Sequence, residues 1–256
     1  MPDRRPSRLV AAAVAAAFAV PLGALVVRAF ADAWRAPGLV PQRFGLRGFD
    51  IAFGGARAAE ALTISLVVAV AATSLALLVG WPAARVLGER RLRHPAPVFL
   101  ILALPLLVPP YAAGFGLSEW FIRLGLSGTI PGLVLVHLLF VLPYVIVVLL
   151  SGFGPQVTSL EEMAQTYGAG PGHRFARVTL PSVAPTLGAA ALLGFLVSWS
   201  QYGSSLAVGA GRPMLPLVML PFVNTDPQTA AAFALLFLLP AVAALLVATR
   251  LARSPL

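Results

Sequence analysis

Two groups of residues have types and spacings that could support chemistry. The first lies in residues 151–182, where Ser159 and Glu162 stand three residues apart, the spacing of a capping box at the start of a helix. The second is a polar group inside a long apolar stretch, where unpaired polar side chains are costly and usually serve a water path or an inter-helix contact. Its members are Ser198, Trp199, Ser200, Gln201, Tyr202, Ser204 and Ser205.

The segment 151–182 has the pattern of a helix, a turn and a second helix lying on a membrane surface. Three apolar or small residues, Met163, Ala164 and Tyr167, share one face of the first helix. The stretch 168–172 contains three glycines and one proline, so we expect it to end that helix. Phe175 and Val178 then restart an apolar face before Pro181.

The polar group at residues 198–205 has two open interpretations. In the first, Ser198, Trp199, Gln201, Tyr202 and Ser205 line the path of a solute. Gln201 and Tyr202 would offer directed hydrogen bonds, and Trp199 a flat apolar or cation-attracting face. Alternatively, the small serines could pack helices together without any solute. His137 stands alone in another apolar stretch, and a hydrogen bond between helices is its expected role; the spacing of the three histidines predicts no metal site.

The residue inventory excludes several kinds of enzyme. All eighteen basic residues are arginine, so the chain has neither a P-loop lysine nor a Schiff-base lysine, and any ATP-driven motor must lie on another polypeptide. It has no cysteine, and it contains no GxSxG, HExxH or HxxEH pattern, which argues against an intramembrane hydrolase. The net charge of +9 comes from arginines at the ends of apolar runs, which favours membrane topology over nucleic-acid binding.

The elements that position these residues are membrane-spanning helices. The chain is 59% hydrophobic and 11% charged, with a mean hydropathy of +0.90, a composition that cannot cover a water-facing surface. The sequence predicts an all-α integral membrane protein with six spans, because each long apolar run approaches the length that a bilayer requires. The expected spans are residues 9–30, 62–84, 98–117, 131–150, 185–206 and 230–249.

The spans carry three further expectations. The first is a retained helix and not a cleaved signal peptide, because its uncharged core is longer than such a peptide needs. Pro105, Pro109 and Pro110 should kink the third span, either as a gate or for packing. Residues 214–223 are apolar but too short to cross, which indicates a re-entrant or interfacial segment.

Arginine counts predict the orientation. With the N-terminus inside, eleven arginines fall on the cytoplasmic side and seven on the outer side, so both termini are expected in the cytoplasm together with residues 151–182. The expected organisation is an N-terminal helix with an outer loop at 1–57, a membrane core at 58–250 and a cytoplasmic tail at 251–256.

Residues 162–181 resemble a motif of a known family. The order Glu162-x-Ala164, then Gly168, nine residues, and Val178-x-Leu180-Pro181 resembles the EAA loop of permease subunits in binding-protein-dependent ABC importers of type I. Met163 and Val178 replace the family's Ala and Ile with other apolar residues. Residues 104–110, 196–202 and 209–216 are similar to the corresponding parts of the same permeases. The resemblance places the contact with the ATPase on Glu162, Met163, Ala164, Tyr167, Gly168, Ala169, Leu180 and Pro181.

The resemblance implies partners and a location. In that family two permease subunits, identical or related, cross the bacterial inner membrane, and two cytosolic ATPase subunits bind ATP and magnesium and engage the EAA loops. A solute-binding protein delivers the solute from outside. The permease needs no cofactor of its own and contacts lipid but no nucleic acid. Residues around Trp199–Tyr202 and 211–216 resemble permeases for polyamines, thiamine or ferric iron.

Physical chemistry is compatible with a docked coupling helix. A switch from 1:99 to 99:1 between two states requires about 5.5 kcal/mol of differential binding, whereas one hydrogen bond contributes about 0.5–1.5 kcal/mol. A whole helix could supply this, with Met163 and Tyr167 as apolar contacts, Glu162 as partner of an ATPase arginine and Gly168 in the turn. The alternative is a self-contained secondary transporter, disfavoured because every acidic residue falls in a loop or near a span end.

Overall fold

The structure is a computed structural model that describes residues 8–35, 37–55, 57–89 and 95–253. Five helical stretches are long and apolar enough to cross a membrane, and a bent pair of helices can supply a sixth. The predicted all-α membrane class is therefore confirmed. The arginines predicted inside at positions 4, 5, 90, 91 and 93 lie outside the described residues. The five stretches are α1 (Arg8–Ala29), α3 (Ala58–Gly88), α6 (Ile130–Leu150), residues Pro171–Trp199 and α12 (Pro227–Arg253).

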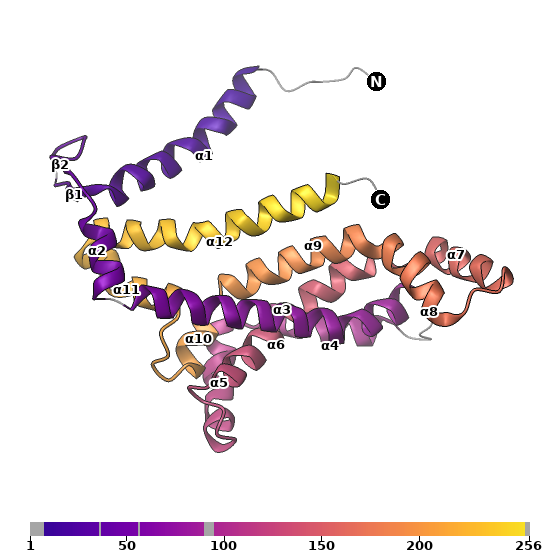
Figure 1. The fold of residues 1–256 in the computed structure, drawn as a ribbon. Helices are drawn as coiled ribbons and strands as arrows, with labels where there is room; N and C mark the ends of the chain where they lie inside the picture. The colour runs from indigo at the N-terminus through magenta and orange to yellow at the C-terminus, as the bar shows by residue number, and fades with distance from the viewer. Residues whose placement is uncertain (1–7, 36, 56, 90–94, 254–256) are drawn as a thin grey trace.

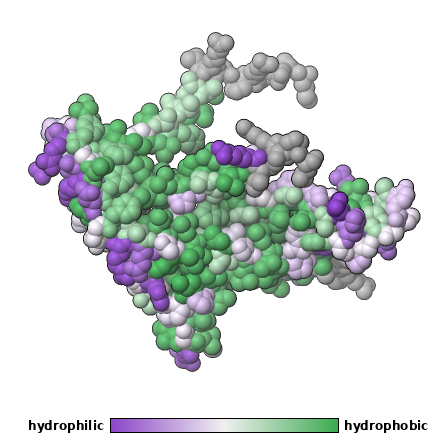
Figure 2. Space-filling view, viewed as in Figure 1, coloured by the Kyte–Doolittle hydropathy of each residue, from purple (hydrophilic) through white to green (hydrophobic). Residues whose placement is uncertain are grey.

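The core is built from three helices that approach closely through small residues. Helix α3 packs along α6 and against α9 (Leu180–Trp199). A Cβ atom on Gly194 of α9 would lie 2.9 Å from Val145 Cγ2 of α6, and one on Gly80 of α3 would lie 3.2 Å from Ile146. Glycine therefore sets the spacing of these helices, as is usual where lipid supplies no hydrophobic driving force. Apolar side chains such as Leu78 remain exposed on the outside, and Figure 2 shows the resulting broad apolar surface.

The predicted third span is two helices, α4 (Pro95–Leu107) and α5 (Pro110–Arg123), which meet at a bend of 97°. The predicted kink near Pro105, Pro109 and Pro110 is therefore confirmed, and it is a break between two helices that together are long and apolar enough for one span. Pro109 has ψ of 131°, an extended value that no helix contains, and Pro110 occupies the first turn of α5. Two consecutive prolines remove two backbone donors, so the chain changes direction here.

The predicted fifth span also differs from the structure. Its helix starts earlier than residue 185, because α8 (Pro171–Arg174) and the π-helical turn η1 (Phe175–Thr179) lead directly into α9. It ends at Trp199, and a break at 200–202 precedes the separate α10 (Gly203–Val208). The predicted span 185–206 was therefore wrong at both ends. Helix α11 (Leu215–Thr225) is short and apolar, as predicted for residues 214–223.

The segment between the first two spans contains structure that the sequence had not indicated. Strands β1 (Ala31–Ala33) and β2 (Arg43–Phe44) pair antiparallel, and α2 (Arg47–Gly54) follows. Asp32 accepts a hydrogen bond from the Arg47 backbone N–H at 3.1 Å and forms an ion pair with Arg43 at 3.3 Å. Figure 1 shows this unit at one end of the molecule and α7 (Pro155–Thr166) at the opposite end.

Candidate functional site

Helix α7 begins earlier than the sequence indicated. Pro155 occupies the first turn and Gly154 the N-cap, with no side-chain cap. The expected capping box of Ser159 and Glu162 was therefore wrong. Proline suits this place because its missing N–H has no partner in a first helical turn. Val157, only 8% exposed, joins the hydrophobic core and fixes the first turn of α7 against the bundle.

One side of α7 is apolar and exposed. Leu160, Met163 and Tyr167 follow at i, i+3 and i+7 and are 46%, 56% and 85% exposed. Glu162 is also exposed, and its carboxylate forms no ion pair with any residue that the structure describes. Helical residues at this spacing form one stripe, which is the arrangement of an amphipathic helix that docks in a groove.

Gly168 ends α7 in a left-handed conformation. Its φ is +85°, its N–H donates to the Gln165 carbonyl at 2.9 Å, and the Ala169 N–H donates to the Ala164 carbonyl at 3.0 Å. These two bonds define a Schellman motif, in which the residue after the C-cap is usually glycine. The predicted role of Gly168 in the turn is thus confirmed. Pro171, expected to help break the helix, instead starts α8.

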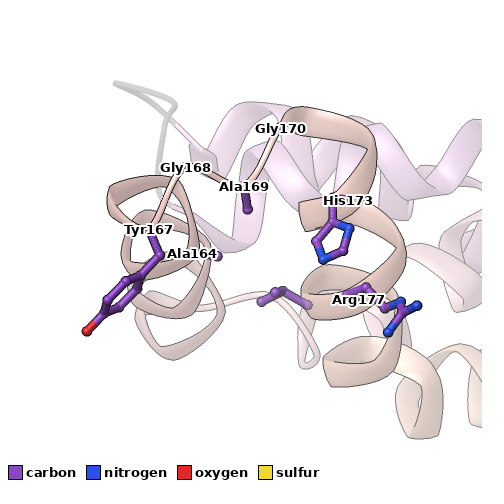
Figure 3. A pocket seen from close by; sticks show the side chains of 8 residues that line it. Ala164, Tyr167, Gly168, Ala169, Gly170, His173 and Arg177 are labelled. Atoms are coloured by element: carbon purple, nitrogen blue, oxygen red, sulfur yellow. The ribbon is translucent and has the colours of Figure 1, made fainter.

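A cleft lies between the end of α7 and the start of the next helix. Its volume is about 570 Å³, and its walls come from both sides of the Gly168 turn. Figure 3 shows His173 and Arg177 on one wall and the Tyr167 ring pointing away from them. The structure thus gathers Ala164, Tyr167, Gly168 and Ala169 at this cleft, while Leu180 and Pro181 lie at the first turn of α9. The lining residues are Ala164, Tyr167, Gly168, Ala169, Gly170, His173, Arg177 and Val178.

The polar group of residues 198–205 surrounds His137 inside the protein. The His137 Nδ1 atom lies 2.8 Å from Ser198 Oγ of α9, and Nε2 lies 2.8 Å from Ser205 Oγ of α10. All three side chains are buried. The predicted hydrogen bond between helices is confirmed, and it joins α6 to both sides of the break at 200–202.

The remaining members of this group are mostly engaged within the chain. Trp199 is 2% exposed, stacks between Phe195 and Phe237, and donates from Nε1 to the Phe237 carbonyl at 3.0 Å. Gln201 is 7% exposed and accepts a hydrogen bond from Ser204 Oγ at 3.3 Å. Helix packing thus accounts for four of the five predicted path residues, Ser198, Trp199, Gln201 and Ser205, and Tyr202 is 38% exposed. The path assignment stays a prediction.

A second hollow lies at the end of the molecule opposite α7. This outer groove has a volume of about 630 Å³, with walls from α2, α10, α11 and the loops beside them. Arg57 and Arg212 both line it. The Arg212 Nε donates to the Gly128 carbonyl at 2.6 Å, and its terminal nitrogens form no hydrogen bond with a described residue. Arg57 is held by Glu60 at 2.7 Å.

Sequence reasoning missed one ionic group beside α7. Glu161, next to Glu162 in sequence, pairs with Arg85 of α3 at 2.5 Å and accepts a hydrogen bond from Thr179 of η1. Arg85 also pairs with Glu89 at 2.7 Å. The i, i+4 spacing of Arg85 and Glu89 was a visible signal for a local pair. Nothing in the sequence signalled the long-range contact with Glu161.

Comparison with known proteins places this geometry in a family. The chain is 34% identical to the Molybdenum transport system permease protein ModB of Mycobacterium tuberculosis over 212 residues, which cover 77% of this chain and 80% of that protein. It is 29% identical to the Putative ABC transporter permease protein ORF1 of Streptomyces antibioticus, over 76% and 88% of the two chains. It is 27% identical to the Putative 2-aminoethylphosphonate transport system permease protein PhnV of Salmonella choleraesuis, over 88% and 87%. No protein-family model matches the chain.

The helical membrane fold and the similarity to these permeases together define the class of transport protein. The chain belongs to the permease subunits of ABC transporters, and specifically to the relatives of the molybdenum permease ModB. The resemblance noted from residues 162–181 is therefore confirmed at the level of the family.

Proposed function

We propose that this chain is the membrane-spanning subunit of an ABC importer and that α7 is its coupling helix. The observation that carries the proposal is the exposed apolar stripe Leu160, Met163 and Tyr167 at the end of a membrane bundle. Beside it lies the exposed carboxylate of Glu162, which forms no ion pair with a described residue. An apolar stripe and one charge suit a groove on a partner protein. Two ATPase subunits, carrying ATP and magnesium, would bind α7 of this chain and of a second permease.

The orientation follows from that role. ATP hydrolysis takes place in the cytoplasm, so α7 would face the cytoplasm of a bacterial inner membrane. From the hairpin unit, helices α1 and α12 both extend toward the side of α7 in Figure 1, so their far ends would lie inside. The hairpin β1–β2, α2 and the outer groove would then face an extracytoplasmic solute-binding protein.

Purification of the complex tests the docking proposal. The tagged chain is extracted from its native membrane in mild detergent, and the proteins that remain bound are identified by mass spectrometry. We expect an ATPase with the wild type and its loss with Glu162→Arg or Met163→Asp, because both changes place charge on the docking face. Glu119→Arg, a charge reversal on exposed α5, is the matched control.

Two outcomes of that experiment would contradict the proposal. An ATPase that is recovered equally with both variants does not bind α7. A chain that comes down alone in several detergents, and transports in a proton gradient without ATP, is a secondary transporter.

For the solute we propose a small tetrahedral oxyanion. Polyamine, thiamine and ferric iron remain untested predictions, and neither the structure nor the relatives support them. The relatives are named for molybdenum and for 2-aminoethylphosphonate, and molybdenum in water is the oxyanion molybdate. Arg212 supplies the outer groove with guanidinium nitrogens that suit such an anion.

Uptake measurements with defined solutes test whether the solute is an oxyanion. Vesicles containing the complex, its binding protein and internal ATP are given molybdate, 2-aminoethylphosphonate, a polyamine or thiamine in parallel. We expect accumulation of an anion, and about a tenfold loss with Arg212→Gln, the effect of removing roughly one charge-assisted contact. Arg123→Gln is the control because Arg123 is exposed on α5, outside the groove. Uptake of the polyamine or thiamine alone would overturn the assignment.

A further inference from the structure

Glu161 is largely buried, whereas the neighbouring Glu162 is exposed, and Glu161 is held by two other elements. Its side chain is 13% exposed. One carboxylate oxygen pairs with Arg85 Nη2 of α3 at 2.5 Å, and the other accepts a hydrogen bond from the Thr179 hydroxyl of η1. Thr179 is only 1% exposed. A single carboxylate thus connects the surface helix α7 to two membrane-spanning segments.

An aromatic layer lies at the same junction. Trp81, one turn before Arg85 on α3, packs edge-to-face on Phe153 with ring centroids 5.0 Å apart and on Phe175 with centroids 5.8 Å apart. Phe153 precedes α7, and Phe175 begins η1. A Cβ atom on Gly88 would lie 2.6 Å from Phe153 Cβ, so the end of α3 touches the start of the loop directly.

The aromatic layer and the ionic contacts of Glu161 restrain α7 in different ways. Edge-to-face aromatic contacts contribute about 0.5–1.5 kcal/mol beyond the apolar area that they bury. A charge-assisted bond to an arginine and a hydroxyl bond to the second carboxylate oxygen fix both position and rotation. Loss of one partner leaves a largely buried charge without compensation, which is strongly unfavourable. The ionic contacts therefore add a directional restraint to the position that Val157 and the aromatic layer give to α7.

We propose that Arg85, Glu161 and Thr179 form a transmission clamp, which makes α7 move as one body with α3 and α9 when the ATPase moves it. The proposal rests on the proposed docking of α7. It assigns the adjacent glutamates separate roles, since Glu162 faces the partner and Glu161 faces the bundle. Glu161, Arg85 and Thr179 are positioning residues, because they act on the transport step through the helices that they join.

A distance measurement tests the clamp without knowledge of the solute. The chain has no cysteine, so Ser159→Cys on α7 and Leu78→Cys on exposed α3 can carry one spin label each. The full complex with a cysteine-free ATPase is measured by double electron–electron resonance, without nucleotide and with trapped ATP. With the clamp intact we expect one narrow distance that is the same in both states.

In variants of the clamp, the distance between the two labels should no longer be single and equal in both nucleotide states. With Glu161→Gln or Thr179→Val we expect loss of the single distance, seen as broadening or as a different distance in each nucleotide state. Thr179→Ser keeps the hydroxyl and should restore the single distance. Glu119→Gln, a carboxylate-to-amide change on exposed α5, should leave the distance between the labels unchanged. If Glu161→Gln is poorly produced, the Val and Ser variants at Thr179 carry the comparison.

Transport per ATP provides the functional measurement. With molybdate as the probe, the ratio of solute moved to ATP hydrolysed should fall about five- to 150-fold in Glu161→Gln, the usual range of coupling between two sites. An unchanged distance in Glu161→Gln and Thr179→Val would overturn the clamp, as would a distance in the wild type that changes with ATP. An ATPase that fails to bind even the wild-type chain would instead overturn the docking of α7, so the two failures are distinguishable.

Discussion

At the scale of single residues, Gly168 is the position at which backbone conformation decides the shape of the end of α7. Its φ of +85° places Ala169 where its N–H reaches the Ala164 carbonyl, and this closes the end of α7. A side chain at this φ meets the following carbonyl, which costs about 1–2 kcal/mol for most residues. Asparagine tolerates the conformation better than other residues with a side chain.

We therefore expect Gly168→Val to abolish ATP-driven uptake while the chain still inserts, and Gly168→Asn to retain most of it. A strain of about 1–2 kcal/mol shifts the turn equilibrium roughly five- to thirtyfold, and a β-branched residue adds more. Uptake in vesicles and the amount of inserted protein are the two measurements. Gly172→Val is the control, because Gly172 lies in α8 with open space around it. Equal uptake in both valine variants would contradict the role of the turn.

The turn could be predicted from sequence, whereas the roles of the neighbouring glutamates could not. The spacing from Gly168 to Val178 and Pro181 identified the turn. Glycine suits a turn because it readily adopts a positive φ, which is a property of the residue itself. Glu161 and Glu162 are chemically identical, and only the rotation of about 100° between successive helical residues separates them. That rotation matters here because Val157 anchors α7, a tertiary contact that no local pattern reveals.

At the scale of elements, two helix breaks pack against each other. Helix α5 begins after the bend at Pro109, and α10 begins after the break at 200–202. A Cβ atom on Gly203 would lie 2.8 Å from the Tyr111 backbone nitrogen, and one on Gly114 would lie 2.9 Å from Ala207 Cβ. The prolines predicted the first break but not its angle of 97°. The second break follows no proline, so sequence reasoning extended that span through it.

A matched pair of glycines on α5 tests this packing. We expect Gly114→Ala to lower the free energy of unfolding by about 1–3 kcal/mol, because the added methyl overpacks the contact with α10. Gly116→Ala, two residues away with nothing within 4 Å, should be neutral or stabilising by up to about 1 kcal/mol through helix propensity. Unfolding in a mild detergent, followed by circular dichroism, measures both. Equal effects would show that α5 and α10 do not depend on this close approach.

At the scale of the whole molecule, one carboxylate ties the first 57 residues to the last span. Asp226, between α11 and α12, pairs with Arg47 of α2 at 2.8 Å and accepts a hydrogen bond from the Thr229 hydroxyl at 2.9 Å. Burial acts to raise the pKa of Asp226, but the bonds from Thr229 and Arg47 outweigh it and lower the pKa. The folded protein therefore holds the charged form more strongly than the unfolded chain does.

The lowered pKa of Asp226 determines how the stability of the folded protein depends on pH. A carboxylate whose folded pKa is depressed stabilises the protein above its unfolded pKa of about 3.9, and this contribution is lost as the pH falls through the folded pKa. We expect Asp226→Asn to be less stable than the wild type by about 1.5–3 kcal/mol at pH 7, with the difference shrinking below about pH 4. Unfolding in a non-ionic detergent from pH 7 to pH 2 measures it. Asp50→Asn, which removes a carboxylate without a described ion pair, should show no such convergence, and a constant difference for Asp226→Asn would contradict the assignment.

Composition was sufficient to predict a helical membrane protein, but not the hairpin unit at the end opposite α7. The span signal is strong because about 20 apolar residues are needed for each crossing. The hairpin β1–β2 has strands of three and two residues, too short for an alternating pattern. Its position depends on Asp32 and on the Arg47–Asp226 pair, which joins residues 179 positions apart.

Orientation is the property of the whole molecule on which both proposals depend, and the absence of cysteine makes it directly measurable. The arginine bias and the proposed binding of an ATPase both predict that α7 lies inside. A membrane-impermeant maleimide should therefore label Leu39→Cys, 92% exposed in the hairpin unit, in intact cells, and Ser159→Cys on α7 only after permeabilisation. The reverse order of labelling would place α7 outside, where no cytosolic ATPase can reach it, and both the docking of α7 and the clamp behind it would fail together.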